Sequence, residues 1–234
     1  MSNKTAIVVG AGIVGLATAR ALAVSGYRVT VIERNSRAVD ASIRNFGMIW
    51  PIGQPDGYLY DTAVRSKEIW LEICAAAGIW HDRVGSLHLA YHRDEWDVLH
   101  ELASVYAHRG YQLLDADAVA LRSKSALQNG LLGGLYSDEE MIVNPRLAIP
   151  AVATWLAEKH GVVFIWNTAA TSIAHPNLRA GEQIFTADEI YVCSGADFET
   201  LFPAEFAARE ITKCKLQMLK LATRPGNNRL GAAL

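Results

Sequence analysis

The sequence predicts an α/β fold with a parallel sheet, and three observations near the N-terminus lead to this prediction. Thr5–Val9 is a short, largely β-branched run, typical of a parallel strand that is buried on both faces. A glycine-rich turn follows at residues 10–15, and the Ala- and Leu-rich segment from Val14 to Ser25 then predicts a helix. A second apolar strand, Tyr27–Ile32, completes a βαβ unit.

The glycine turn has the spacing of a dinucleotide-binding motif. Gly10 permits the tight turn from strand to helix, Gly12 lets the backbone approach a pyrophosphate, and Gly15 lets the helix pack closely on the strand. The helix N-terminus, at Ile13 and Val14, offers free N–H groups and a dipole that favour negative charge.

Glu33 ends the second strand, about twenty residues after the turn, where an acidic side chain accepts hydrogen bonds from ribose hydroxyls. An acid there also repels a 2′-phosphate, which disfavours NADP. Strand, helix, strand and acid fall in the order of a Rossmann-type unit, so we predict dinucleotide binding. A plain strand-to-helix corner is the alternative interpretation.

Composition narrows the class of protein. The chain has 234 residues, of which 51% are hydrophobic, and a formal net charge of −2. The sequence contains no run of Lys and Arg residues that would predict binding to nucleic acid or to an anionic membrane. It also contains no apolar run of the roughly 20 residues that span a bilayer. The three cysteines are widely separated and the histidines lack a metal-binding spacing, so we expect a cytoplasmic protein without disulfides or a metal site.

The remaining elements are predicted from periodicity and from turn residues. Residues 34–55 show no period and are rich in Gly and Pro near their end, so we expect an ordered loop that wraps a ligand. Apolar stripes and stop signals predict helices over Tyr58–Ala77, Arg93–Arg109, Ala116–Ser123 and Arg146–His160. Strands are expected within Gly85–Tyr91, Gly130–Tyr136, Gly161–Ile165, Asn167–Ile173 and Ala187–Gly195.

Four segments together resemble a known family. They are Gly10–Gly15 with Glu33 and Arg34, the loop from Ala41 to Gly47, the strand from Gly161 to Ala170, and the turn Val192–Gly195. Their order is similar to that in the FAD-dependent amine and amino-acid oxidoreductases, the group of D-amino-acid oxidase, glycine oxidase and sarcosine oxidase.

The resemblance implies FAD as the cofactor and a Rossmann-type FAD-binding domain interleaved with an α+β substrate domain. The FAD-binding domain is expected at 1–85 and 138–200 and the substrate domain at 86–137 and 201–234. The resemblance also implies which residues contact FAD: Gly10, Gly12, Ile13, Val14 and Gly15 at the pyrophosphate, Glu33 and Arg34 at the adenosine, Ser42, Arg44, Asn45 and Gly47 along the phosphates and ribityl chain, and Ala170, Ser194 and Gly195 through backbone groups.

Two departures from the family pattern stand out. The family usually has an aromatic residue where this chain has Asp197. Family members also continue beyond a strand expected at Lys215–Leu221, whereas this sequence stops at Leu234. We therefore expect an incomplete substrate domain, from a fragment or a truncated gene.

The expected reaction is oxidation of the C–N bond of a small amine, amino acid or aminophosphonate to an imine. The chemistry requires no dedicated base. The candidates for contact with the reacting groups are Arg44, Met48 and Trp50. The simpler interpretation is that Arg44 is a surface arginine and that Met48 and Trp50 are core side chains. An NAD-dependent dehydrogenase and a non-catalytic flavin-binding remnant are the alternatives. The expected partner is the small-molecule substrate, and a homo-oligomer is compatible with the sequence.

Overall fold

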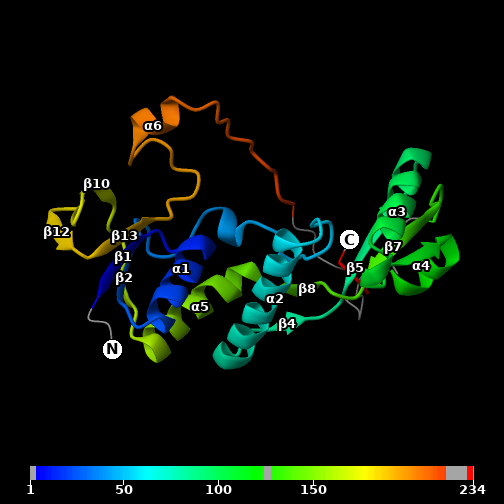
Figure 1. Ribbon diagram of the computed structural model, residues 1–234, viewed down its shortest axis with the longest axis horizontal. Helices are drawn as coiled ribbons and strands as arrows, with labels where there is room; N and C mark the ends of the chain where they lie inside the picture. The colour runs from blue at the N-terminus through cyan, green and yellow to red at the C-terminus, as the bar shows by residue number, and fades with distance from the viewer. Residues whose placement is uncertain (1–3, 124–127, 220–230, 234) are drawn as a thin grey trace. The chain divides into compact units, whose positions relative to one another are not determined.

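The computed structural model describes residues 4–123, 128–219 and 231–233 (Figure 1). The chain divides into two compact units, each made of two separate stretches. Unit 1 consists of Met1–Asn45 and Pro145–Met218, and unit 2 of Phe46–Asn144 and Leu219–Leu234. This division places residues 46–85 and 138–144 in unit 2 and residues 201–218 in unit 1, so the limits of the compact units differ from the expected domain limits.

Unit 1 is built on a four-stranded parallel sheet in the order β13-β1-β2-β9. Its strands are β1 (Thr5–Val9), β2 (Arg28–Ile32), β9 (Val163–Ile165) and β13 (Glu189–Val192). Because β1 lies in the middle of the sheet, its last four residues are buried, as the apolar run predicted. The carboxyl ends of β1, β2 and β13 therefore lie at the same edge of the sheet.

Helices cover one face of this sheet. The helix α1 (Ile13–Val24) connects β1 to β2 and packs against both strands and against α5 (Pro145–His160) (Figure 1). Leu16 and Ala19 of α1 are fully buried. The helix ends at Ser25, and Gly26 then adopts the positive φ that ends many helices.

A small antiparallel sheet covers the other face. It contains β10 (Ala170–Ala174), β11 (Asn177–Ala180) and β12 (Gln183–Thr186) in that order. Ile7, Val9 and Ile32 form a common core with Leu178 of this sheet and with Leu201. The last two strands of the small sheet were not predicted, because each has only four residues. The alternation of β11 is too short to stand out in the sequence, and β12 is largely exposed and does not alternate.

Two short helical segments complete unit 1. The 3-10 turn η1 (Ala41–Ile43) lies within the predicted loop and packs near α5. The helix α6 (Pro203–Ala207) follows β13 after a loop. The strand expected at Lys215–Leu221 is wrong for residues 215–219, which form no ladder and are largely exposed; residues 220–221 lie outside the described residues.

Unit 2 contains two three-stranded antiparallel sheets. One has the order β3-β8-β4, from Met48–Ile49, Met141–Val143 and His81–Asp82. The other has the order β5-β7-β6, from Ser86–Ala90, Gly133–Ser137 and Gln112–Asp115. Because β3 and β4 both pair with β8, residues 46–85 cluster with unit 2.

The helices of unit 2 agree closely with the predicted ranges. They are α2 (Tyr58–Ala77), α3 (Arg93–Val105) followed by the 3-10 turn η2 (Ala107–Arg109), and α4 (Ala116–Arg122). Both α3 and α4 pack against the β5-β7-β6 sheet. Within the described part of the chain, no helix has the length and apolarity needed to cross a membrane.

The packing of α1 gives a test of the unit 1 core. Leu16→Ala is expected to lower the free energy of unfolding by about 2–5 kcal/mol, because the Leu16 side chain is fully buried and its removal leaves a cavity. Val24→Ala is the control, since Val24 is 61% exposed on the same helix. Urea denaturation followed by circular dichroism measures both, and equal midpoints for the two variants would contradict this packing.

Candidate functional site

The glycine turn between β1 and α1 is as tight as its spacing predicted. A Cβ atom on Gly15 would lie 1.9 Å from the Gly10 carbonyl oxygen, and one on Gly10 would lie 2.4 Å from the Cys193 carbonyl oxygen. Gly10 also has a φ of +102°, which side chains disfavour. Two of the three glycines are therefore required by the protein's own backbone packing.

Glu33 fixes this turn from the end of β2. Its carboxylate is buried and accepts a hydrogen bond from the Ala11 N–H at 2.9 Å. The other carboxylate oxygen accepts from the backbone N–H of Asn35 at 3.0 Å and from the Asn35 side-chain amide at 3.2 Å. Each carboxylate oxygen has about two acceptor sites, so the oxygen bonded to Ala11 retains capacity for a ligand hydroxyl.

The turn η1 approaches the N-terminus of α1. The Ser42 hydroxyl oxygen accepts a hydrogen bond from the Ile13 N–H at 2.9 Å, so this N–H is not free, contrary to expectation. Asn45 donates to the carbonyl groups of Ala41 and Ser42 and stabilises the turn. Val14 is 64% exposed. Ser42 is thus held close to the position expected for a pyrophosphate.

The turn after β13, residues 194–197, faces the glycine turn across the carboxyl edge of the sheet. The Asp197 N–H donates to the Ser194 carbonyl oxygen at 3.3 Å, and Gly195 has a φ of +64°. The Asp197 carboxylate forms a close ion pair with Arg34. Although burial alone raises the pKa of Asp197, its hydrogen bonds with Arg34, Thr200 and the Glu199 N–H hold that pKa well below the usual range.

These elements surround a cavity of about 480 Å³ at the carboxyl edge of the parallel sheet. This volume is within the range of about 300–1,000 Å³ common for small-molecule sites. Ligands of open α/β sheets bind at this edge. The lining includes nine of the predicted cofactor residues: Gly10, Gly12, Glu33, Arg34, Ser42, Arg44, Ala170, Ser194 and Gly195.

The cavity fits an anionic dinucleotide in two respects. The N–H groups of Gly10, Ala11 and Ile13 have acceptors, whereas that of Gly12 has none among the described residues. Of the three cationic lining residues, Arg34 pairs with Asp197 and Lys213 with Glu199, and Arg44 alone has no ion-pair partner in the described part of the chain.

Sequence analysis missed several lining residues. Asp197 was noted only as a departure from the family pattern, and its pairing with Arg34 joins positions 163 residues apart. Others in this group are Ala38, Val39, Asp40, Glu199, Leu201 and Lys213. No local pattern marks them, because they lie in irregular segments brought to the cavity by the sheet. Burial raises the pKa of the Cys193 thiol.

Three predicted residues belong to unit 2. The Gly47 carbonyl oxygen accepts from the Val143 N–H, and Met48 pairs with Ile142 in the β3–β8 ladder. Trp50 packs edge-on against His88, with ring centroids 5.3 Å apart.

The Trp50–His88 contact is strongly desolvated. Trp50 Nε1 and His88 Nε2 are buried without a hydrogen-bond partner among the described residues. Burial lowers the pKa of His88, against a smaller opposing effect of Glu140. The fully buried Glu140 carboxylate accepts hydrogen bonds from the Ile52 N–H and the Ser86 hydroxyl, both at 3.0 Å, and so ties the chain after Trp50 to β5.

Other chemistries have less support in the described residues. No group of three or more His, Cys, Asp or Glu side chains there is arranged to hold a metal ion. Cys74, Cys193 and Cys214 are all free thiols.

Comparison with known proteins identifies the family. The model of the DAO family, described as FAD dependent oxidoreductase, matches residues 5–233. The chain belongs to this family. FAD is therefore the cofactor of this fold, which decides against the NAD alternative, and the predicted α/β fold class is confirmed.

Relatives in sequence include two differently named enzymes. The tRNA 5-methylaminomethyl-2-thiouridine biosynthesis bifunctional protein MnmC of Stutzerimonas stutzeri is 26% identical over 212 residues, covering 83% of this chain and 30% of the relative. The glycine oxidase of Pseudomonas aeruginosa is 38% identical over 68 residues, covering 29% of this chain and 18% of the relative. The chain thus spans less than a third of the length of these relatives.

Solved structures of similar fold include glycine oxidase from Geobacillus kaustophilus, with a TM-score of 0.76 and 21% identity over 86% of this chain and 58% of that one. L-amino acid deaminase from Proteus myxofaciens gives a TM-score of 0.73 with 17% identity, covering 84% of this chain and 46% of that one. At these identities the likeness shows the fold.

The glycine contacts of this DAO-family chain predict different outcomes for two alanine variants. Gly15→Ala is expected to lower the free energy of unfolding by about 1–3 kcal/mol, because its Cβ meets the Gly10 carbonyl oxygen, which cannot rotate away. Gly12→Ala is expected to cost about 1 kcal/mol or less, because its Cβ meets only a side-chain atom, the Ser42 hydroxyl oxygen at 3.0 Å, which needs to shift by only a few tenths of an ångström. Urea denaturation of both variants tests the difference, and a larger loss for Gly12→Ala would contradict this geometry.

The burial of His88 predicts a pH dependence of stability. Its folded pKa lies below the unfolded value of about 6.5, so the unfolded chain takes up the proton first and stability falls as the pH drops through this region. His88→Phe keeps a ring against Trp50 and is expected to reduce the stability loss between about pH 7.5 and 5.5. Thermal unfolding of the variant and of the unsubstituted chain at both pH values measures this loss of stability.

The control for this measurement is His100→Phe. His100 also meets a tryptophan edge, that of Trp96, but on the exposed side of α3. An equal reduction in both variants would show that His88 is not the titrating group.

Proposed function

We propose that this chain binds FAD in the cavity at the carboxyl edge of the unit 1 sheet. The proposal rests on three groups that line one cavity in a chain of an FAD-dependent family: the Gly12 N–H, the Ser42 hydroxyl and Arg44. Among the described residues, the Gly12 N–H has no acceptor and Arg44 has no ion-pair partner. In this arrangement the Gly12 N–H and Arg44 bind the pyrophosphate, and the unused acceptor capacity of Glu33 binds a ribose hydroxyl.

The remaining predicted residues complete the proposed contact set. Gly10 and Gly15 keep the turn tight, and Ile13 and Val14 place the helix N-terminus near the phosphates. Ala170, Ser194 and Gly195 contact the cofactor through backbone groups, with Arg34 beside the adenine. Asn45 holds the Ser42 turn, and Gly47 continues the chain toward Met48.

The proposed reaction is oxidation of the C–N bond of a small amine, amino acid or aminophosphonate to an imine. FAD supplies the acceptor for the hydride equivalent. The names of glycine oxidase and L-amino acid deaminase among the similar proteins support an amine or amino-acid substrate. In this proposal Arg44 steadies negative charge on the cofactor.

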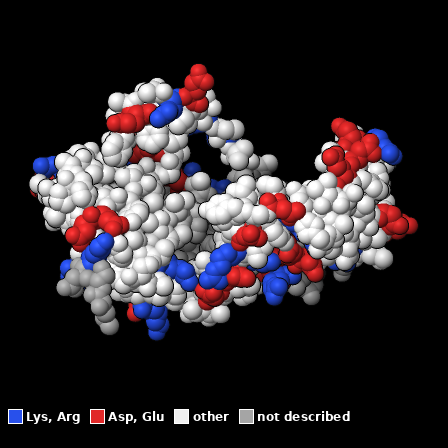
Figure 2. Space-filling model, viewed as in Figure 1, with Lys and Arg blue, Asp and Glu red and all other residues white. Residues whose placement is uncertain are grey.

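We propose a free small molecule as the substrate rather than a nucleic acid, although one relative is named for tRNA modification. The net charge of −2 supports this choice, and Figure 2 shows acidic and basic side chains interspersed over the face in view. A cytoplasmic location, based on the three unpaired cysteines, is part of the same proposal, and a homo-oligomer is compatible with it.

Flavin absorbance tests both parts of the proposal. The purified chain, incubated with FAD and desalted, is expected to retain the yellow flavin spectrum. Anaerobic addition of glycine, sarcosine, a D-amino acid or an aminophosphonate is expected to bleach it for at least one substrate. Retained flavin without bleaching would favour the flavin-binding remnant, and no retained flavin would contradict the cavity assignment.

Arg44→Met provides a residue-level test of the same site. Losing a charge-assisted hydrogen bond to the pyrophosphate is expected to raise the Kd for FAD about tenfold. Arg28→Met is the matched control, because Arg28 is exposed at the opposite end of β2 from the cavity. Equal Kd values for the two variants, measured by flavin fluorescence quenching, would exclude Arg44 from the site.

A further inference from the structure

Asp197 joins the two sides of the cavity mouth. On its own side, its N–H donates to the Ser194 carbonyl oxygen, and the Ser194 hydroxyl donates back to the Asp197 carbonyl oxygen at 3.4 Å. One carboxylate oxygen accepts from the N–H groups of Glu199 and Thr200, at 3.1 and 3.0 Å. Any movement of Asp197 therefore moves the Ser194–Gly195 turn.

The Arg34 guanidinium donates to the other carboxylate oxygen of Asp197, and both residues line the cavity. The backbone beside Arg34 is fixed, because the Glu33 N–H donates to the Ile165 carbonyl oxygen and the Thr168 N–H donates to the Glu33 carbonyl oxygen. The Arg34–Asp197 pair thus connects a rigid strand end to a turn.

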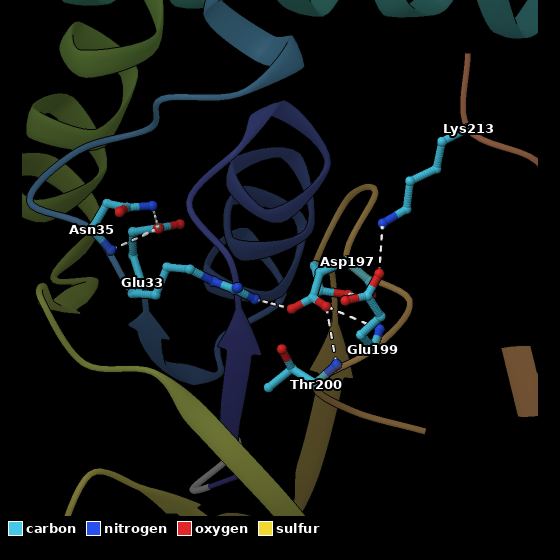
Figure 3. A network of polar contacts seen from close by, with 8 residues as sticks. Glu33, Asn35, Asp197, Glu199, Thr200 and Lys213 are labelled. Atoms are coloured by element: carbon cyan, nitrogen blue, oxygen red, sulfur yellow. Dashed lines mark hydrogen bonds and ion pairs between the residues drawn. The ribbon is translucent and has the colours of Figure 1, made fainter. Parts of the chain in front are cut away.

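The chain beyond Asp197 has few other attachments to the sheet. Phe198 stacks on Phe206 of α6. Lys213 pairs with Glu199 at 3.4 Å (Figure 3), so both contacts lie within the segment itself. Most residues from 202 to 213 are exposed. Glu199 and Lys213 nevertheless line the cavity, so the segment borders the site while its attachment depends largely on Asp197 and on the buried Leu201.

We propose that Arg34 and Asp197 are positioning residues whose ion pair holds the 194–200 turn over the bound cofactor and so sets its rate of release. The inference rests on the proposed function, because it takes FAD to be the occupant of the cavity. It adds that cofactor retention falls as ionic strength rises, since the Arg34 side chain is 44% exposed and salt screens such a pair.

Three variants test the pairing. Asp197→Asn removes the charge but keeps an oxygen for the Glu199 and Thr200 N–H groups, and Arg34→Met keeps the aliphatic part of the side chain. The third variant combines both. Arg65→Met is the control, because it removes an exposed ion pair on α2.

FAD release, followed by the rise in flavin fluorescence after dilution, is the first measurement. Each single variant is expected to release FAD about three to ten times faster than the unsubstituted chain. The double variant is expected to match the singles, because the two side chains act through one interaction. Added salt is expected to accelerate release in the unsubstituted chain and in Arg65→Met, and to have less effect in the other variants.

Two results would overturn the proposal. Additive effects in the double variant would show that Arg34 and Asp197 act separately. Slower release in Asp197→Asn would show that Asp197 withholds Arg34 from the cofactor.

Hydrogen exchange without FAD keeps this test separate from the proposed function. The amides of residues 194–200 are expected to exchange faster in either variant, and in the unsubstituted chain at high salt. A chain that binds no FAD but shows this change would contradict the FAD assignment while supporting the ion pair's hold on the turn. Unchanged exchange would overturn the proposal.

Discussion

The geometry of the glycine turn in unit 1 depends most directly on the hydrogen bonds of the buried Glu33 carboxylate. It accepts from the Ala11 N–H in the glycine turn and from Asn35 beyond the end of β2. A buried carboxylate is stable only when its oxygens are well hydrogen-bonded, so the three donors fix its position closely. The residue expected to bind a ribose is therefore also the residue that fixes the pyrophosphate turn relative to β2.

Residues 5–33 were predictable because their structure depends on local signals. The β-branched run of β1, the glycine spacing and Gly26 each specify a conformation within a few residues, and the observed α1 differs from its predicted limits by one residue at each end. The short strands were not predictable in the same way. Met48–Ile49 and His81–Asp82 are strands because β8 lies between them, and two residues cannot show a period.

The residues of the candidate site also fall into two groups: those predictable from local sequence and those that depend on contacts distant in the sequence. The roles of the glycines and Glu33 can be inferred from their spacing in the sequence. The Arg34–Asp197 pair instead depends on the sheet order, in which β2 and β13 lie on either side of β1. Asp197 looked anomalous in the sequence because its partner is 163 residues away. The strand expected at Lys215 failed for a related reason: an apolar run becomes a strand only where a neighbouring strand accepts its hydrogen bonds.

The two walls of the cavity consequently differ in physical character. The Gly10–Gly15 wall is fixed by backbone contacts that leave no room for a Cβ and by a buried carboxylate, neither of which responds much to salt. The Ser194–Asp197 wall is held across the cavity by a partly exposed ion pair, whose strength depends on ionic conditions. A cofactor bound between them would have its pyrophosphate on the rigid wall, while the adjustable wall would determine how readily it leaves.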